Sequence, residues 1–376
     1  MALSAGTKRT VACLLVGLGA LLIVAALLIP TYAVGQLGKT PLDIEITTIA
    51  KNKPDAPSEV LDSKSLTSGD APAKVDQNVR LLSQRFLTVE DPSDKDQMTI
   101  QAGQTLRNID KQGDTGLLSA TIDRVTIDRK DGMPVDTDPN GSIASTVNSK
   151  GESVAEPVQH TGLSYRFPIG TEKQTYPYFD LNARKSFDIN FVEETEINDL
   201  KVYHFQQQIP ATDLAKVANS PTNRLALPAS KWGVEGGDAT VTMDRYYTNT
   251  RDVWVEPKTG TVIKGSEQLH MYYGRTEKPE VTALKSTLVF DDNTVASQIS
   301  EAKKYMDELS LYSRILPIVF GVVGIIALIA GLFLGLRGGD GSGPGRLVQR
   351  RQSSDPQPGQ DFSDAPTQQI NLSGNQ

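Results

Sequence analysis

Histidines, carboxylates and nucleophiles are the residues of this chain that could do chemistry, and they complete no motif. The three histidines, His160, His204 and His270, lie far apart in the sequence, whereas a metal site needs clustered ligands. Glu194 and Glu196 would share one face of a strand, a pattern that a solvated strand edge explains. A paired-carboxylate hydrolase stays open, because such pairs come from distant positions. The sequence lacks the glycine motifs of serine hydrolases, P-loop proteins and dinucleotide-binding proteins, so neither a catalytic residue nor a cofactor is predicted.

One stretch has the spacing of a calcium ligand set. Asp136-x-Asp138-x-Asn140-Gly141 matches the first half of a calcium-binding loop, with oxygen ligands and a glycine for the turn. Position twelve of that loop is Val147, where a bidentate Glu is needed. A polar Asn-Gly turn is therefore the better interpretation, and calcium is the weaker alternative.

An aromatic segment is the most unusual part of the sequence. Residues 161–180 hold five of the 21 Phe and Tyr residues, namely Tyr165, Phe167, Tyr176, Tyr178 and Phe179. Rings with polar tips suit an amphipathic ligand, such as a lipid with a sugar head. We therefore take these five residues and Trp254 as candidate ligand contacts. The alternative is that the aromatic rings fill the core beside a hairpin at 252–270.

Two apolar runs must position everything else. Val11–Ile29 and Ile315–Leu336 contain no charged residue, and each is long enough to cross about 30 Å of hydrocarbon. The sequence predicts transmembrane helices over 11–30, ended by Pro30, and over 315–336. A cleaved signal peptide is the alternative for the first run, but the run exceeds the usual roughly 7–15 apolar residues and no A-x-A follows it.

The basic residues near the spans predict the orientation. Lys8 and Arg9 precede the first span, and the cytoplasmic side of a membrane protein carries the excess of Lys and Arg. Residues 1–10 and 337–376 are then cytoplasmic, and 34–312 form an extracytoplasmic domain. The tail from 337 is rich in Gly, Ser, Pro and Gln and is expected to be disordered.

Small residues in the second span indicate close helix packing. Gly331 and Gly335 form a G-x-x-x-G step, and Gly17 lies in the first span. Such steps let helix backbones approach closely, so pairing of the two spans or self-association is a hypothesis. The alternative is that glycine is simply common in membrane helices.

The segment between the spans is expected to be mainly β, with curved sheets in a barrel-like or sandwich-like arrangement. Apolar residues alternate with polar ones around 42–47, 186–191, 201–209 and 240–243, the period of half-buried strands. Further strands are expected at 118–127 and 281–290. Pro257 and Gly260 between two apolar runs predict a hairpin.

Loops and helices complete the expected domain. Segments 51–77 and 131–160 are rich in turn-forming residues and are expected to be loops, and 211–219 a short helix. Thr294 is expected to cap a helical stalk over about 295–312 that continues into the second span.

Charge and cysteine content exclude several classes of function. The formal net charge is −7, and residues 10–336 carry −9, because Lys8 and Arg9 add +2 and the tail charges cancel. An acidic domain repels phosphates, so nucleic-acid binding is not expected. Cys13 is the sole cysteine, which excludes an intramolecular disulfide and thiol chemistry in the domain.

Three elements carry a resemblance to a known family. They are Gly162-x-x-Tyr165-x-Phe167-Pro168, Tyr176-x-x-x-Asp180 and Trp254-Val255-x-Pro257-x-Thr259-Gly260, between two terminal spans. This pattern resembles the PorA family of actinobacterial envelope proteins, long of unknown function, over most of residues 9–336. The layout, though not the disulfide content, is also similar to that of the scavenger-receptor class B family.

The resemblance implies a role in the envelope of mycolic-acid bacteria. Family members are linked to maturation of lipomannan and lipoarabinomannan, one member gave the family its porin name, and no catalytic residues are established to carry over. The expected function is a non-enzymatic lipid or lipoglycan binding or assembly factor in the plasma membrane. Its expected partners are membrane lipids, lipoglycan, or other membrane proteins through the helices. A scaffold for envelope proteins, a porin-like channel and a glycan-processing enzyme are the alternatives.

Overall fold

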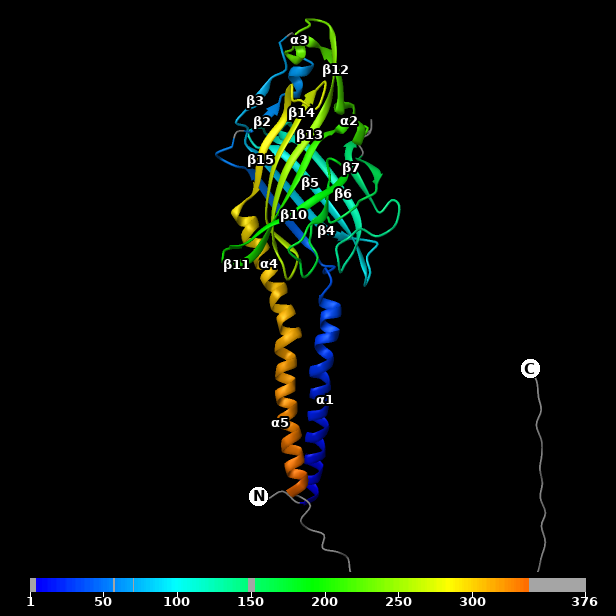
Figure 1. Ribbon diagram of the computed structural model, residues 1–376, viewed down its shortest axis with the longest axis vertical. Coiled ribbons are helices and arrows are strands. Elements are labelled where there is room, and N and C mark those ends of the chain that lie inside the picture. Colours follow the sequence, from blue (N-terminus) through cyan, green and yellow to red (C-terminus); the bar gives the residue numbers. More distant parts are fainter. Residues whose placement is uncertain (1–4, 57, 70, 148–152, 338–376) are drawn as a thin grey trace, which may run out of the picture. The chain divides into compact units, whose positions relative to one another are not determined.

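The computed structural model describes residues 5–56, 58–69, 71–147 and 153–337 (Figure 1). The predicted disordered tail falls at 338–376, outside these residues. By internal contacts the chain divides into two compact units, one formed by the residues up to Leu18 with those from Ala327, the other by Gly19–Ile326. The second unit contains the whole sheet, and we call its Glu45–Ser310 part the sheet domain.

The described residues form fifteen strands in one antiparallel sheet. Their bounds are β1 (Glu45–Asn52), β2 (Glu59–Leu61), β3 (Val75–Gln77), β4 (Leu81–Glu90), β5 (Gln97–Asn108), β6 (Leu117–Asp128), β7 (Gly141–Val147), β8 (Ser153–Val158), β9 (Tyr176–Asp180), β10 (Lys185–Ile197), β11 (Leu200–Asp213), β12 (Arg224–Pro228), β13 (Thr240–Glu256), β14 (Thr261–Gly274) and β15 (Val281–Phe290).

The strands follow the order β8-β7-β6-β5-β4-β1-β15-β14-β13-β11-β10-β9, with β12 beside β13 and with β2 joining β3 to β15. Most neighbours in this order are also neighbours in the chain. The most distant pair in the chain is the central one, in which β1 meets β15 through Ala50 opposite Phe290 and Asn52 opposite Leu288. The first and last strands thus join two halves of the sheet.

The sheet curls so that its two end strands approach each other (Figure 1). An ion pair links Arg184, after β9, to Glu156 of β8, and Phe179 of β9 packs with Ile143 and Val158 from the other end. Within the described residues, no backbone ladder joins β8 to β9. The prediction of a mainly β domain with curved sheets between two apolar helices is confirmed, and the sheet is open rather than a closed barrel.

Burial alternates along the strands and places the core inside the curl. In β13, Tyr247, Val253 and Val255 are buried and lie an even number of positions apart, as the two-residue period of a strand requires. Tyr247 packs with Leu81 of β4 and Leu269 of β14 in one apolar cluster. Opposite walls of the curled sheet therefore share one core.

Helices flank the sheet in the chain. They are α1 (Ala5–Leu37), α2 (Leu214–Val217), α3 (Ala229–Trp232), α4 (Asp292–Ser310) and α5 (Leu316–Arg337), with a π-helical turn, Leu311–Ile315, joining α4 to α5. Two helices are long and apolar enough to cross a membrane, Gly6–Tyr32 and the continuous helix Asp292–Arg337.

Two predictions about the helix ends were wrong. Pro30 lies inside α1, which continues to Leu37; membrane helices tolerate proline because neighbouring groups satisfy the backbone carbonyl that it leaves without a partner. Asp291, and not Thr294, caps α4 by accepting the Thr294 N–H. The Thr294 hydroxyl is occupied instead by the backbone of Ile49 in β1.

The prediction that 51–77 and 131–160 are loops was also wrong. They contain β2, β3, β7 and β8, four short strands at or near the edges of the sheet. Turn-forming residues are tolerated at such positions, since edge strands need fewer backbone hydrogen bonds. The long strands β4 and β5 had not been expected from the sequence.

Candidate functional site

A cleft opens on the inner face of the curled sheet. It holds about 1060 Å³ of space not filled by atoms, including the solvent at its mouth. The apolar part of its wall comes from β1, β4, β5, β13, β14, β15 and the residue before β1: Ile44, Ile46, Leu87, Val89, Ile100, Val253, Val262, Leu288 and Phe290. Gln298 of α4 also lines it. The predominantly apolar wall, with a few polar groups, is typical of small-molecule sites.

A charged cluster forms the polar part of the wall. Arg251 of β13 contacts Asp180 at 2.9 Å and Glu267 of β14 at 2.8 Å, and donates to the side-chain oxygen of Gln207 at 2.6 Å. Asp180 also accepts a hydrogen bond from the Tyr247 hydroxyl. Both carboxylates therefore have donors, as buried charges require.

The protonation states of this cluster follow from its charges. Burial is the largest single effect and would raise the pKa of Glu267, but the charges of Arg251 and Arg85 and the hydrogen bond from Arg251 together outweigh it, and the pKa is lowered from 4.5. Burial and the Asp180 charge raise the pKa of Tyr247 well above 10.0. Glu267 is thus ionised and Tyr247 neutral at pH 7, so the cluster presents fixed charges and no group poised for proton transfer near neutrality.

Tyr165 stands at the centre of a second buried polar group. Its hydroxyl donates to Asp123 of β6, whose other oxygen lies 2.8 Å from Nε2 of His160. Burial, with the Asp123 charge, raises the pKa of Tyr165 well above 10.0. Tyr165 has φ of 64°, a left-handed conformation that costs a non-glycine residue energy and is often found at functional sites.

The predicted aromatic residues separate into two groups. Tyr165 and Tyr178 line the cleft. Phe167 and Tyr176 instead pack on Phe205 in the core, with ring centroids 4.9 and 5.9 Å from it. Phe167 and Tyr176 therefore fill the core, as the alternative prediction had it. Tyr165 and Tyr178 are the two rings that are placed to contact a ligand.

Phe179 and Trp254 lie away from the cleft wall. Phe179 packs on the His160 ring with centroids 4.4 Å apart. Trp254 stacks on His204 at 4.6 Å and joins the cluster under α4. Neither residue is among those lining the cleft, so we do not carry them further as ligand contacts.

The weak calcium candidate is not assembled by the fold. Asp136 and Asp138 are exposed, whereas the Asn140 side chain is buried and bonds the backbone of Val135 and of His160. Across the described residues no group of three or more His, Cys, Asp and Glu could hold a metal. The hydrogen bonds of the Asn140 side chain link the segment before β7 to the segment after β8.

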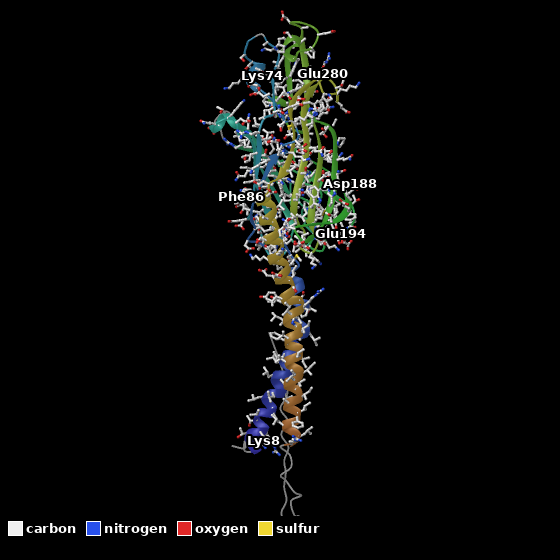
Figure 2. All side chains as sticks on the ribbon, turned by 90° about the vertical axis from the view of Figure 1, so that its left-hand side faces the viewer. Lys8, Lys74, Phe86, Asp188, Glu194 and Glu280 are labelled. Atoms are coloured by element: carbon white, nitrogen blue, oxygen red, sulfur yellow. The ribbon has the colours of Figure 1, made fainter. Side chains whose placement is uncertain are left out.

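Glu194 of β10 is bound to two lysines. Glu194 contacts Lys173 at 2.7 Å and Lys201 at 2.6 Å. Figure 2 shows Glu194 and Asp188 on one side of the sheet domain and Phe86 of β4 on the opposite side. Hydrogen bonds from the two lysines lower the pKa of Glu194, so it is not suited to act as an acid at neutral pH.

The two apolar helices meet at their small residues. A Cβ added to Gly331 would lie 2.9 Å from the Ala12 carbonyl oxygen and 2.8 Å from a methyl carbon of Val16, and one at Gly335 would lie 3.8 Å from Ala12. Gly17 has no atom within 4 Å of such a Cβ. The glycine step thus lies at an α1–α5 contact, and Gly17 lies outside it.

Sequence reasoning missed the charged wall of the cleft. Arg85, Arg251 and Glu267 had drawn no attention, because charged residues on strands normally face water, and Asp180 was noted only as part of the family pattern. One signal existed: Arg251 shares its alternating register in β13 with Tyr247, Val253 and Val255. A charge on the apolar face of a strand predicts a buried partner.

Two helices of membrane-spanning length around one antiparallel sheet define an integral membrane protein with a single β domain. A family model described as Porin PorA matches residues 11–333, and the chain belongs to this PorA family. A protein of Corynebacterium amycolatum named Porin PorA is 30% identical over 380 residues, covering 86% of this chain and 98% of that protein. Another Porin PorA, from Corynebacterium resistens, is 30% identical over 402 residues, covering 88% and 97%. The chain is thus a membrane protein of the cell envelope.

Proposed function

We propose that this protein is a non-enzymatic envelope factor that binds a lipid, or the lipid part of a lipoglycan, in the cleft of its sheet domain. In this proposal both termini are cytoplasmic and the sheet domain lies outside the plasma membrane. The lysines and arginines at the N-terminus support that orientation. Binding of this kind would serve assembly of envelope lipoglycans, including lipomannan and lipoarabinomannan.

The cleft is the observation that carries the proposal. Its wall combines an apolar surface with a few fixed polar groups, the combination that binds and orients an amphipathic molecule. The wall includes Gln298 of α4, and α4 continues without interruption toward the membrane-spanning α5. A lipid leaving the bilayer would therefore meet the cleft close to the helix that anchors the domain.

Mass spectrometry of the purified full-length protein tests the proposal. The protein would be extracted in mild detergent and its co-purifying lipids measured per mole of chain. Ile46→Trp places a bulky ring in the cleft, since Ile46 lines it, and should remove the bound lipid. Thr47→Trp is the matched control, because Thr47 is the next residue of β1 and is exposed.

The expected result is lipid retained by the wild type and by Thr47→Trp and reduced about tenfold by Ile46→Trp. Lipids around α1 and α5 are common to all three proteins and cancel in the comparison. Equal lipid content in Ile46→Trp and Thr47→Trp, with both proteins folded, would refute binding in the cleft.

The names of the relatives favour a second candidate, a channel. The apolar faces available for lipid contact in the described residues are those of α1 and α5, so a pore would need several copies of the chain. Planar-bilayer recordings with the pure protein test this candidate. Step-like conductance that depends on the protein would support it, and silent bilayers containing the inserted protein would count against it.

A further inference from the structure

Arg166 is a buried cation on the wall of the cleft. Arg166 is 7% exposed to solvent, and it is among the residues that line the cleft. One guanidinium nitrogen, Nη2, donates to the Thr259 carbonyl at 2.9 Å. Its Nε is buried with no hydrogen-bond partner. No carboxylate of the described residues lies within 4.0 Å of it.

The other buried arginine of the cleft is neutralised. Arg251 lies between Asp180 and Glu267 and uses Nε, Nη1 and Nη2 as donors. The same fold thus places two carboxylates in contact with Arg251 and none in contact with Arg166, on whose charge Glu301 of α4 acts only from a distance. Because an uncompensated buried charge is costly, the difference calls for an anion from outside the chain.

The surroundings of Arg166 keep the charge in place. Burial lowers the pKa of Arg166 below its usual range, while Tyr305 and Glu301 of α4 oppose that change, and a guanidinium stays protonated in proteins. The bond to Thr259, in the turn between β13 and β14, fixes the position of the guanidinium. A guanidinium that is held in place and has N–H groups without acceptors is suited to bind the oxygens of a carboxylate or a phosphate.

We propose that the cleft takes an anionic amphiphile, whose carboxylate or phosphate pairs with Arg166 while its hydrocarbon chain lies along Ile44, Ile46 and Leu87. This inference rests on the proposed function, since it names the class of ligand for the same cleft. Arg85 lines the same cleft, and among the described residues its guanidinium donates only to the Gln104 side chain, so it adds a second positive charge for the same head group.

A structural role for Arg166 makes a different prediction. The Arg166 side chain links residues 161–180 to the β13–β14 turn through its hydrogen bond to the Thr259 carbonyl. This structural role uses a single N–H group of the guanidinium. Loss of the tie would lower stability but would not make binding depend on the charge of the ligand. The ligand's charge, rather than the protein's stability, is therefore the quantity to vary.

Photolabelling of the full-length wild type tests the inference without any substitution. The protein would be reconstituted in phosphatidylcholine vesicles with a fatty acid that carries a diazirine on its chain, or with its methyl ester. Adducts are mapped by peptide mass spectrometry, and cleft labelling is divided by labelling of α1 and α5, which report probe dissolved in the membrane. A diazirine-bearing monoalkyl phosphate in a third sample distinguishes a phosphate from a carboxylate.

We expect the normalised cleft labelling to be about tenfold or more higher for one or both anions than for the ester. Equal labelling by anions and ester would overturn this inference and leave the proposed function standing. Labelling of α1 and α5 with none in the cleft, by every probe, would overturn both.

Variants assign the preference to Arg166. Arg166→Met should abolish the preference for the anion, and Arg166→Lys should restore part of it. Arg245→Met is the control, because Arg245 also has a buried Nε without a partner but does not line the cleft. A preference for the anion that persists in folded Arg166→Met would overturn the assignment to Arg166. If Arg166→Met does not fold, a comparison of Arg166→Lys with the wild type still tests whether Arg166 causes the preference.

Discussion

Arg251 and Asp180 meet inside the curled sheet, with Nη2 of the arginine 2.9 Å from a carboxylate oxygen, although 71 residues separate them in the chain. Asp180 is the last residue of β9, at one end of the strand order, and Arg251 lies on β13. The pair therefore depends on the curvature that brings the end strands over the core.

Removing the Arg251 charge should destabilise the sheet domain. Arg251→Met leaves Asp180 and Glu267 buried without their cation, a change that typically costs about 3–5 kcal/mol. The unfolding free energy can be followed in denaturant by the fluorescence of Trp232 and Trp254, both in the sheet domain. Arg275→Met, which breaks an exposed pair with Glu280, is the control and should cause a far smaller loss. Similar losses in the two variants would contradict this view of the cluster.

Stability of the sheet domain should fall in acid through Glu267. Its pKa in the fold is lower than the ordinary 4.5, so its contribution is complete above pH 4.5 and is lost as pH falls through the lower folded value. Denaturant midpoints measured from pH 7 to pH 3 should therefore decline, with most of the change below pH 4.5. Glu267→Gln should reduce the slope, and an unchanged slope would show that other carboxylates account for it.

The α1–α5 contact should be sensitive to the size of residue 331. Gly331→Leu forces a side chain into the Ala12 carbonyl and Val16, whose atoms lie within 3 Å of an added Cβ; overpacking of this kind costs about 1–3 kcal/mol. Thermal unfolding in nanodiscs should show the loss. Gly17→Leu meets nothing within 4 Å and should be neutral. Equal effects at the two glycines would indicate that the helices do not pack through Gly331.

The turn between β13 and β14 should tolerate no side chain at position 260. Gly260 has φ of 70°, and an added Cβ would lie 2.1 Å from the Phe167 carbonyl oxygen. Gly237 has a similar φ of 59° with nothing within 4 Å. Gly237→Ala should therefore cost only the backbone strain, about 1–2 kcal/mol, and Gly260→Ala considerably more. Equal denaturant midpoints would mean that the aromatic segment moves aside freely.

Local patterns predicted the parts of the fold that depend on local physics. The two apolar helices, the 253–263 hairpin and the strands with strict alternation follow from hydrocarbon length and the two-residue period. β4 and β5 were not predicted because polar residues such as Arg85 and Gln104 occupy positions that face the inside of the curl, which interrupts the alternation. The short edge strands were not predicted because turn-forming residues are tolerated in such strands and make them look like loops.

The sequence predicted the type of ligand that the cleft could bind, but not most of the residues that form its wall. An amphipathic ligand was inferred from the rings of residues 161–180, and Tyr165 and Tyr178 do line the cleft. The partners of those rings come from β1, β4 and β13–β15, and the sequence does not indicate which strands face one another across a curled sheet. The difference between paired Arg251 and unpaired Arg166 depends wholly on that long-range arrangement.

The junction between β1 and β15 has a consequence for biogenesis. The two halves of the sheet are joined by strands at opposite ends of the sheet domain, with the Asp291 N–H bonded to the Ile49 carbonyl beside the junction. Contacts so distant in sequence form late. If the sheet domain lies outside the plasma membrane as proposed, the sheet cannot be completed until Phe290 has crossed, and β1 and β2 lack their neighbour β15 until then. The unfinished halves would then need protection by export chaperones.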